Sequence, residues 1–339
     1  MDLVYKLQAV QGIRFDKDCP CCHVKLIQVS GKKGRRTIRL YKKGLPVLDR
    51  LHPGLLDLYM EKFQQHRFSN DRSHVERNHR VAEVLAACMA ADIETRPYLL
   101  PPLQKTAFSQ IVPGPPSFYI ARHIKKLSED EISKTAYTRL VGALFYPSGY
   151  YAAYNTRSAV MKWSGRGEMK ALGNLQELAR LNAGCDEAPS ALLFGNNADA
   201  ALQTMLESDK SRKQDLRFDR IYPHTHFMPL DQNGVRLLKM LVLPDWNETL
   251  LAALFEPNQR SYDKGAIEYD AIVDSRIVLS HLDGDIARLI RFREALAYRT
   301  EPAVVLCFPW QAAFLGAYLG RLAELRVVEA DTVEAALFQ

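Results

Sequence analysis

The carboxylates near the middle of the chain include a spacing that phosphodiester-cleaving enzymes use to hold Mg²⁺. Glu168-Met169-Lys170 is a Glu-x-Lys tripeptide, and carboxylate oxygens suit this hard cation. The tripeptide follows Gly165-Arg166-Gly167, which indicates a helix start, where the helix dipole favours an acidic residue. The preceding predicted strand, Tyr150–Thr156, carries tyrosine and asparagine where a metal-binding carboxylate would be needed. We therefore expect Glu168 to face solvent and take no part in catalysis.

A second acidic group lies in the last third of the chain. Asp283 and Asp285 precede a helical pattern, and aspartates at that position typically cap the helix. Asp270 is expected in the middle of a strand, on the same face as Glu268. The sequence pairs no basic residue with these two nearby. We expect no metal site from this group, which also includes Asp274.

His224 and His226 are separated by one residue in an extended segment, so both side chains should lie on one face of a strand. Two histidines can begin a metal site, but the sequence identifies no third ligand. Walker and Rossmann phosphate loops and the Gly-x-Ser-x-Gly elbow are also absent from the sequence. We predict no metal, no cofactor and no catalytic residue, and a non-catalytic protein is favoured.

Residues 24–43 have the strongest binding signature, because they carry eight cations and no acidic residue. The cations are Lys25, Lys32, Lys33, Arg35, Arg36, Arg39, Lys42 and Lys43. Apolar and β-branched residues on both sides of a Gly-Lys-Lys-Gly turn predict a β-hairpin. A two-stranded ribbon with a cationic tip suits a phosphate backbone or a minor groove. The alternative is an ordinary solvated surface hairpin.

Helical patterns flank this ribbon, with Leu3, Val4 and Leu7 before it and residues 45–51 after it. A helix, a basic hairpin and a second helix resemble the later part of a winged helix. Tyr5, Lys6 and Gln8 on the first helix are the weaker candidates for base contact. A winged helix has two earlier helices, so either these are absent or the native chain extends upstream of Met1.

The charge distribution agrees with a local polyanion-binding surface. Residues 1–100 contain 18 Lys and Arg against 11 Asp and Glu, a net charge of +7, while the whole chain has +6. Apolar residues make up 47% of the chain, which is enough for real hydrophobic cores. No run of 18 apolar residues and no signal peptide is present, so we expect a cytoplasmic protein without a membrane partner.

The chain is expected to have an α+β and α/β organisation. Residues 1–93 form a winged-helix-like unit plus helices, and residues 94–117 form a proline-rich linker. Strands and helices then alternate in an α/β core over 118–245 and a C-terminal α/β subdomain over 246–339.

The sequence also resembles the replication-relaxation proteins of plasmids and integrative conjugative elements. The resemblance rests on motifs that lie mainly within residues 1–245. They are residues 39–44, Asn78-His79-Arg80, Ala82-Glu83-Val84, Phe118-Tyr119, Arg139 with Gly142 and Leu144, Tyr154-Asn155-Thr156, Met161-Lys162-Trp163 and residues 306–311. It implies a winged helix joined to a restriction-endonuclease-like core, degenerate here because typical members have an acidic residue in the strand of Tyr154.

The sequence therefore predicts a non-catalytic, double-stranded-DNA-binding accessory protein of a mobile genetic element. It would serve plasmid replication, mobilisation or their regulation. One alternative is a metal-dependent nuclease of the PD-(D/E)XK type. Another is a protein-binding module that docks a relaxase or a replication initiator. The DNA site, the protein partner and the oligomeric state, including a homo-oligomer, stay open.

We predict that protein purified without added metal holds no zinc at its cysteine cluster. Cys19, Cys21, Cys22 and His23 are soft ligands in one short segment, but the second, separated pair of a typical structural site is missing. Elemental analysis measures the zinc content per chain. One zinc per chain that is lost in Cys21→Ser would contradict the prediction.

Overall fold

The computed structural model describes 14 parts of the chain. They are residues 27–30, 37–40, 46, 50, 72–95, 115–121, 124, 139–147, 149–157, 166–183, 185, 190–209, 217–260 and 268–338. Contacts divide the chain into two compact units, Met1–Ala86 and Ala87–Gln339. The cysteine cluster at residues 19–23 and the proline-rich segment 96–114 lie outside the described residues.

In the first unit, the predicted hairpin is confirmed. Strands β1 (Ile27–Ser30) and β2 (Thr37–Leu40) pair antiparallel, with Ile27 opposite Leu40 and Ser30 opposite Thr37. The sequence also predicts a helix over about 71–91, capped by residues 69–71, and the structure confirms it as α5 (Arg72–Ala90), which continues into the second unit. The first helix of the winged-helix prediction lies outside the described residues, so the winged helix stays a prediction.

The second unit contains a mixed five-stranded sheet in the order β3-β4-β5-β6-β7. Its strands are β3 (Ser117–Ile120), β4 (Leu140–Tyr146), β5 (Gly149–Arg157), β6 (Ser190–Gly195) and β7 (Thr225–Pro229). The first three pair antiparallel, while β5, β6 and β7 are parallel. The sequence predicts a strand, a turn and a second strand over 139–156, and β4 and β5 confirm this hairpin.

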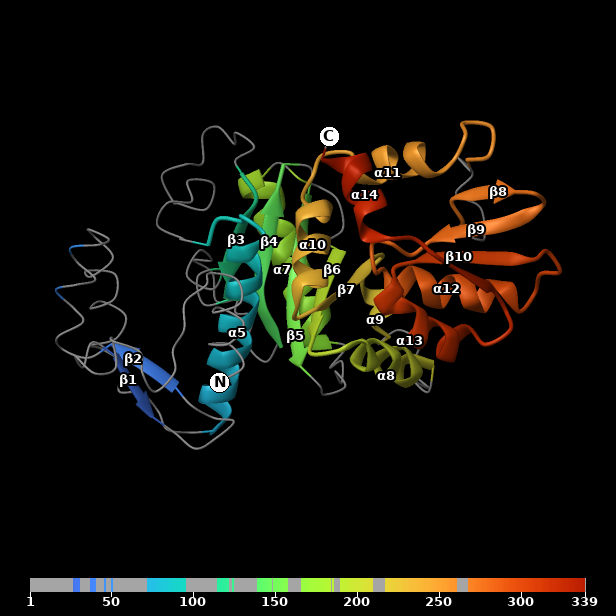
Figure 1. Ribbon diagram of the computed structural model, residues 1–339. Helices are drawn as coiled ribbons and strands as arrows, with labels where there is room; N and C mark the ends of the chain where they lie inside the picture. The colour runs from blue at the N-terminus through green and yellow to red at the C-terminus, as the bar shows by residue number, and fades with distance from the viewer. Residues whose placement is uncertain are drawn as a thin grey trace. The chain divides into compact units, whose positions relative to one another are not determined.

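Helices cover both faces of this sheet, which is why central strand β5 is buried from Tyr150 to Thr156. The helices α7 (Arg166–Ala183), α8 (Ala198–Asp209) and α9 (Phe218–Ile221) lie between the parallel strands in sequence. Helix α10 (Gln232–Leu241) follows β7 and lies in front of the sheet in Figure 1, with α7 behind it. Gly234 allows a close approach, because a Cβ there would lie 1.9 Å from the carbonyl oxygen of Pro229.

A second, four-stranded sheet follows in the order β11-β10-β9-β8. Its strands are β8 (Ala271–Val273), β9 (Arg276–Ser280), β10 (Ala303–Cys307) and β11 (Glu324–Val327). Strands β8 and β9 form an antiparallel hairpin, and the other neighbours are parallel. Asp274 and Ser275 connect β8 to β9, both with positive φ, as two-residue hairpin turns require.

Four further helices belong to this part of the unit. Helix α12 (Ile286–Leu296) joins β9 to β10, and α13 (Pro309–Leu319) joins β10 to β11. Helices α11 (Trp246–Leu254) and α14 (Ala330–Leu337) contact each other and have no counterpart among the predicted elements. The strand predicted to include Asp270 begins later, so this residue precedes β8.

The buried apolar side chains of both sheets form one continuous cluster. Phe227 of β7, Ile286 of α12, Met205 of α8 and Phe314 of α13 all belong to it. The predicted mixed α/β architecture is confirmed, while an endonuclease-like fold stays a proposal. Among the described helices, none has the length and apolar character needed to span a membrane.

Candidate nucleic-acid interface and a buried polar junction

Eight of the predicted DNA-contacting residues belong to the basic segment 24–43, and the other three precede it in the sequence. Arg39 lies in β2, paired with Gln28 of β1. The other ten lie outside the described residues: Tyr5, Lys6, Gln8, Lys25, Lys32, Lys33, Arg35, Arg36, Lys42 and Lys43. The strand register places four of these cations in the connection between β1 and β2. Because Ser30 pairs with Thr37, only residues 31–36 connect the strands, and four of these six are Lys or Arg.

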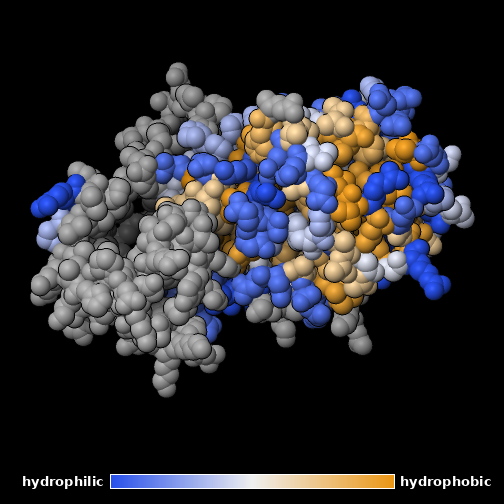
Figure 2. All heavy atoms as spheres, in the orientation of Figure 1, coloured by the Kyte–Doolittle hydropathy of each residue, from blue (hydrophilic) through white to orange (hydrophobic). Residues whose placement is uncertain are grey.

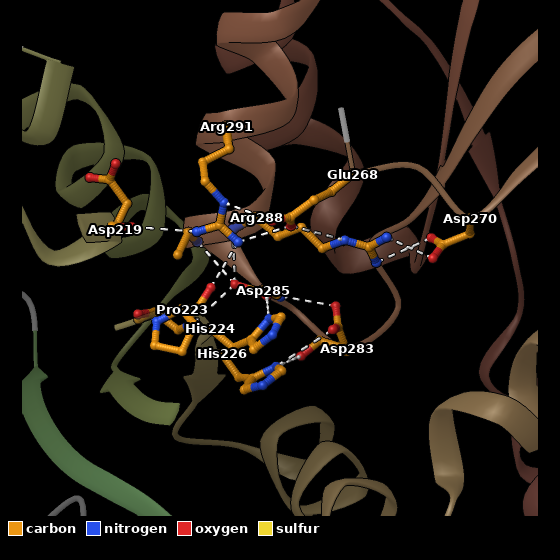
Figure 3. A network of polar contacts seen from close by, with 12 residues as sticks. Asp219, Pro223, His224, His226, Glu268, Asp270, Asp283, Asp285, Arg288 and Arg291 are labelled. Atoms are coloured by element: carbon orange, nitrogen blue, oxygen red, sulfur yellow. Dashed lines mark hydrogen bonds and ion pairs between the residues drawn. The ribbon is translucent and has the colours of Figure 1, made fainter. Parts of the chain in front are cut away.

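In the second unit, the polar side chains gather where the loop after β9 meets the edge of β7 (Figure 3). Asp285 is the centre of this junction and is 1% exposed. Its Oδ1 accepts hydrogen bonds from the backbone N–H groups of Thr225, Ala287 and Arg288 at 3.0–3.1 Å. Its Oδ2 lies 2.7 Å from Nδ1 of His224. One carboxylate thus caps α12, as the sequence predicted, and also holds the start of β7.

Two opposed influences act on this pair. Burial alone would raise the pKa of Asp285, but the hydrogen bond and charge of His224 and the other donors hold it well below its usual range. Burial would lower the pKa of His224, but the hydrogen bond and charge of Asp285 outweigh it and raise the pKa. The His224 side chain is 47% exposed, so this ion pair joins a solvent-accessible ring to a buried carboxylate.

The second histidine, His226, also contacts the loop after β9 through its Nδ1 atom. Nδ1 of His226 lies 3.0 Å from the carbonyl oxygen of Asp283, and its ring is nearly parallel to that of His224, at a centroid distance of 6.3 Å. The prediction that both rings lie on one side of the strand is confirmed. Gly284 completes the contact, because its carbonyl accepts the N–H of Phe227 at 2.8 Å. Its φ of +70° is one that glycine adopts without strain.

Two arginines of α12 extend the network. Arg288 holds both carboxylate oxygens of buried Asp270, at 2.7 and 3.2 Å. Arg291 binds Glu268 and the carbonyl oxygen of Pro223. These basic partners come from a helix 18 to 23 residues further along the chain, so the sequence near Asp270 and Glu268 gave no sign of them. The spacing of three residues places both arginines on one face of α12.

His281 occupies the same loop but is fully enclosed. Burial lowers the pKa of this imidazole to about 4, so the ring is neutral near neutral pH. Its carbonyl oxygen accepts from the side chain of buried Gln311, which in turn accepts the N–H of Phe308. This histidine and glutamine, which the sequence did not single out, tie the ends of β9 and β10 together.

Glu168 corrects another expectation. It lies in the first turn of α7, as predicted, but it is 1% exposed and does not face solvent. It accepts a hydrogen bond from the hydroxyl of Tyr154 at 2.9 Å, and that hydroxyl also contacts the hydroxyl of Tyr222. Burial raises the pKa of Glu168. Tyr154 of β5 is therefore the partner of this carboxyl.

The polar side chains described above bond to one another and to backbone groups of the second unit. Within the described part of the chain, no group of three or more His, Cys, Asp or Glu could hold a metal ion. An apolar groove of about 170 Å³ lies elsewhere, between α10, the start of α13 and α14. Figure 2 shows hydrophobic residues gathered over the region of α11 and α14. The groove is lined by Leu237, Met240, Phe308, Trp310, Val333 and Leu337, among others.

Comparison with known proteins adds no assignment: no protein-family model, no curated protein and no solved structure matches this chain. The resemblance to replication-relaxation proteins therefore stays a proposal.

We predict that Asp285→Asn lowers the free energy of unfolding by an amount that depends on pH. The pKa of Asp285 is lowered on folding, so its contribution is present above the unfolded value of about 4 and is lost as pH falls through the folded one. The pKa of His224 is raised, so its contribution is complete below about 6.5 and is lost as pH rises through the folded value. Denaturant titration should show a larger deficit at about pH 5.5 than at about pH 8.5.

Asparagine can still cap α12, so this variant removes the charge and keeps the acceptor for backbone N–H groups. Asp285→Ala removes both and should cost about 3 kcal/mol, because the N–H of Thr225 also loses its partner. A deficit of equal size at both pH values would show that the ion pair with His224 is not the source of the effect.

Proposed function

We propose that this protein binds double-stranded DNA through the hairpin of its first unit, as a non-catalytic accessory protein of a mobile genetic element. The main support is the pairing of Ser30 with Thr37, because it leaves a six-residue connection between the strands that contains four cations. Four charges in so short a connection can neutralise successive phosphates and release their counterions. The net charge of +7 within residues 1–100 adds long-range attraction to the same part of the chain.

The carboxylates of the second unit support binding without cleavage. Hydrolysis of a phosphodiester with Mg²⁺ requires carboxylates that are free to coordinate the ion and its water. Glu168 is buried and accepts from Tyr154, Asp270 is held by Arg288, and Asp285 accepts four hydrogen bonds. Each of these groups already stabilises the fold. The resemblance to replication-relaxation proteins supports a role in plasmid replication or mobilisation.

We predict that replacing Lys32, Lys33, Arg35 and Arg36 by alanine weakens binding to duplex DNA and flattens its salt dependence. Each phosphate contact contributes roughly 0.9 to the slope of log K against log salt, so the slope should fall by about two to four. Fluorescence anisotropy on a labelled duplex across a salt series measures both quantities.

A matched control removes the same amount of charge from the second unit, by alanine at Arg180, Lys239, Arg299 and Arg321. These side chains are partly or largely exposed, and their loss should leave the salt slope nearly unchanged. If both variants lose affinity equally, net charge rather than the hairpin governs binding. Unchanged affinity of the hairpin variant at low salt would refute the proposal.

A further inference from the structure

The two sheets of the second unit have four outer edges, and three of them are covered by backbone from outside the sheet. Glu94 bridges to Ser117 along β3, and Asp285 bridges to His226 along β7. On the second sheet, Arg260 bridges to Ala271, and Ile272 donates to the carbonyl of Gln259. Such coverage matters because an uncovered edge offers unpaired N–H and C=O groups to another chain.

Strand β11 is the fourth edge, and it is different. Among the residues that the structure describes, none forms a bridge or a strand pair with its outer side. Glu324, Arg326 and Val327 are exposed, and Val327 retains 48% of its accessible surface. Leu322, just before the strand, is 45% exposed. Apolar side chains thus lie next to a row of backbone groups.

The hydrogen bonds to β10 show which backbone groups point outward. The N–H of Val328 donates to the carbonyl of Cys307 on β10 at 2.8 Å. In a strand, the N–H and C=O of one residue point to the same side, and the next residue points to the other. Residues 324, 326 and 328 therefore face β10, while Leu325 and Val327 direct their N–H and C=O groups to the outer edge.

We propose that β11 pairs with β11 of a second copy of this chain, in an antiparallel arrangement centred on Leu325. Two copies related by a twofold axis normal to the sheet run antiparallel, and an isologous contact must be complementary to itself. Centring on Leu325 makes Leu325 a hydrogen-bonded pair with its own copy. It also places Glu324 opposite Arg326 in the closer, non-hydrogen-bonded pairs.

Charge selects this register over its neighbours. Centring on Arg326 would place two arginines opposite each other, and centring on Glu324 would place two glutamates opposite each other, both of which are unfavourable. The flanking residues continue the complementarity, since Ala323 would oppose Val327 and Leu322 would oppose Val328. The strand is thus apolar at both ends and oppositely charged about its centre. This dimer goes beyond DNA binding and does not depend on it.

Sedimentation velocity of the full chain without DNA, over a concentration series at low salt, tests the proposal. We expect a reversible monomer–dimer equilibrium. Glu324→Arg alone or Arg326→Glu alone converts two attractive pairs per dimer into two repulsive pairs, and each should raise the dissociation constant by at least about tenfold. An equimolar mixture of the two variants should form a heterodimer, because one then carries two cations and the other two anions at these positions.

The combined variant Glu324→Arg/Arg326→Glu is the matched control, since it exchanges the charges, keeps the composition and should dimerise as the wild type does. Glu324 also pairs with exposed Arg276, so thermal unfolding of each variant checks that the monomer stays folded. A wild type that is monomeric throughout the series would overturn the proposal. So would single variants that dimerise as tightly as the wild type.

Discussion

The second unit depends on one buried carboxylate. Asp285 accepts hydrogen bonds from the start of α12 and from the edge of β7, so it fixes the second sheet's first crossover helix against the last strand of the first sheet. A buried charge is costly unless several donors surround it, and here four do. Arg288 then links the same helix to Asp270, and the shared apolar cluster fills the space between the sheets. The polar side chains of this junction therefore hold α12 and β7 together.

The sequence predicted those features that arise from local patterns. The hairpin of β1 and β2, the helix α5, the cap at Asp285 and the shared face of His224 and His226 all follow from residues near one another. The partners of Glu168 and Asp270 could not be predicted in this way. Tyr154 binds Glu168 from a buried strand, and Tyr222 joins this pair from 68 residues further along the chain. Arg288 reaches Asp270 from the helix that follows the β8–β9 hairpin. Burial and charge pairing of this kind arise only once the sheets have been packed.

The two units differ in what they offer a partner. The first unit concentrates positive charge in residues 24–43. In the second unit, buried carboxylates are paired within the fold: Asp285 with His224, Asp270 with Arg288 and Asp219 with Arg217. Among the described residues, none pairs with the outer edge of β11, and the proposed dimer forms at this edge. In the proposed function the first unit binds through electrostatic attraction, which salt weakens, whereas salt affects the buried contacts of the second unit much less.

Hydrogen-exchange mass spectrometry of the full chain, with and without duplex DNA, tests most directly whether the ribbon is the binding surface. The proposed function predicts that DNA slows exchange in peptides covering residues 24–43 and leaves peptides covering residues 281–291 unchanged, because the junction is already enclosed. Protection within the second unit, with none in residues 24–43, would contradict the assignment of DNA binding to the hairpin.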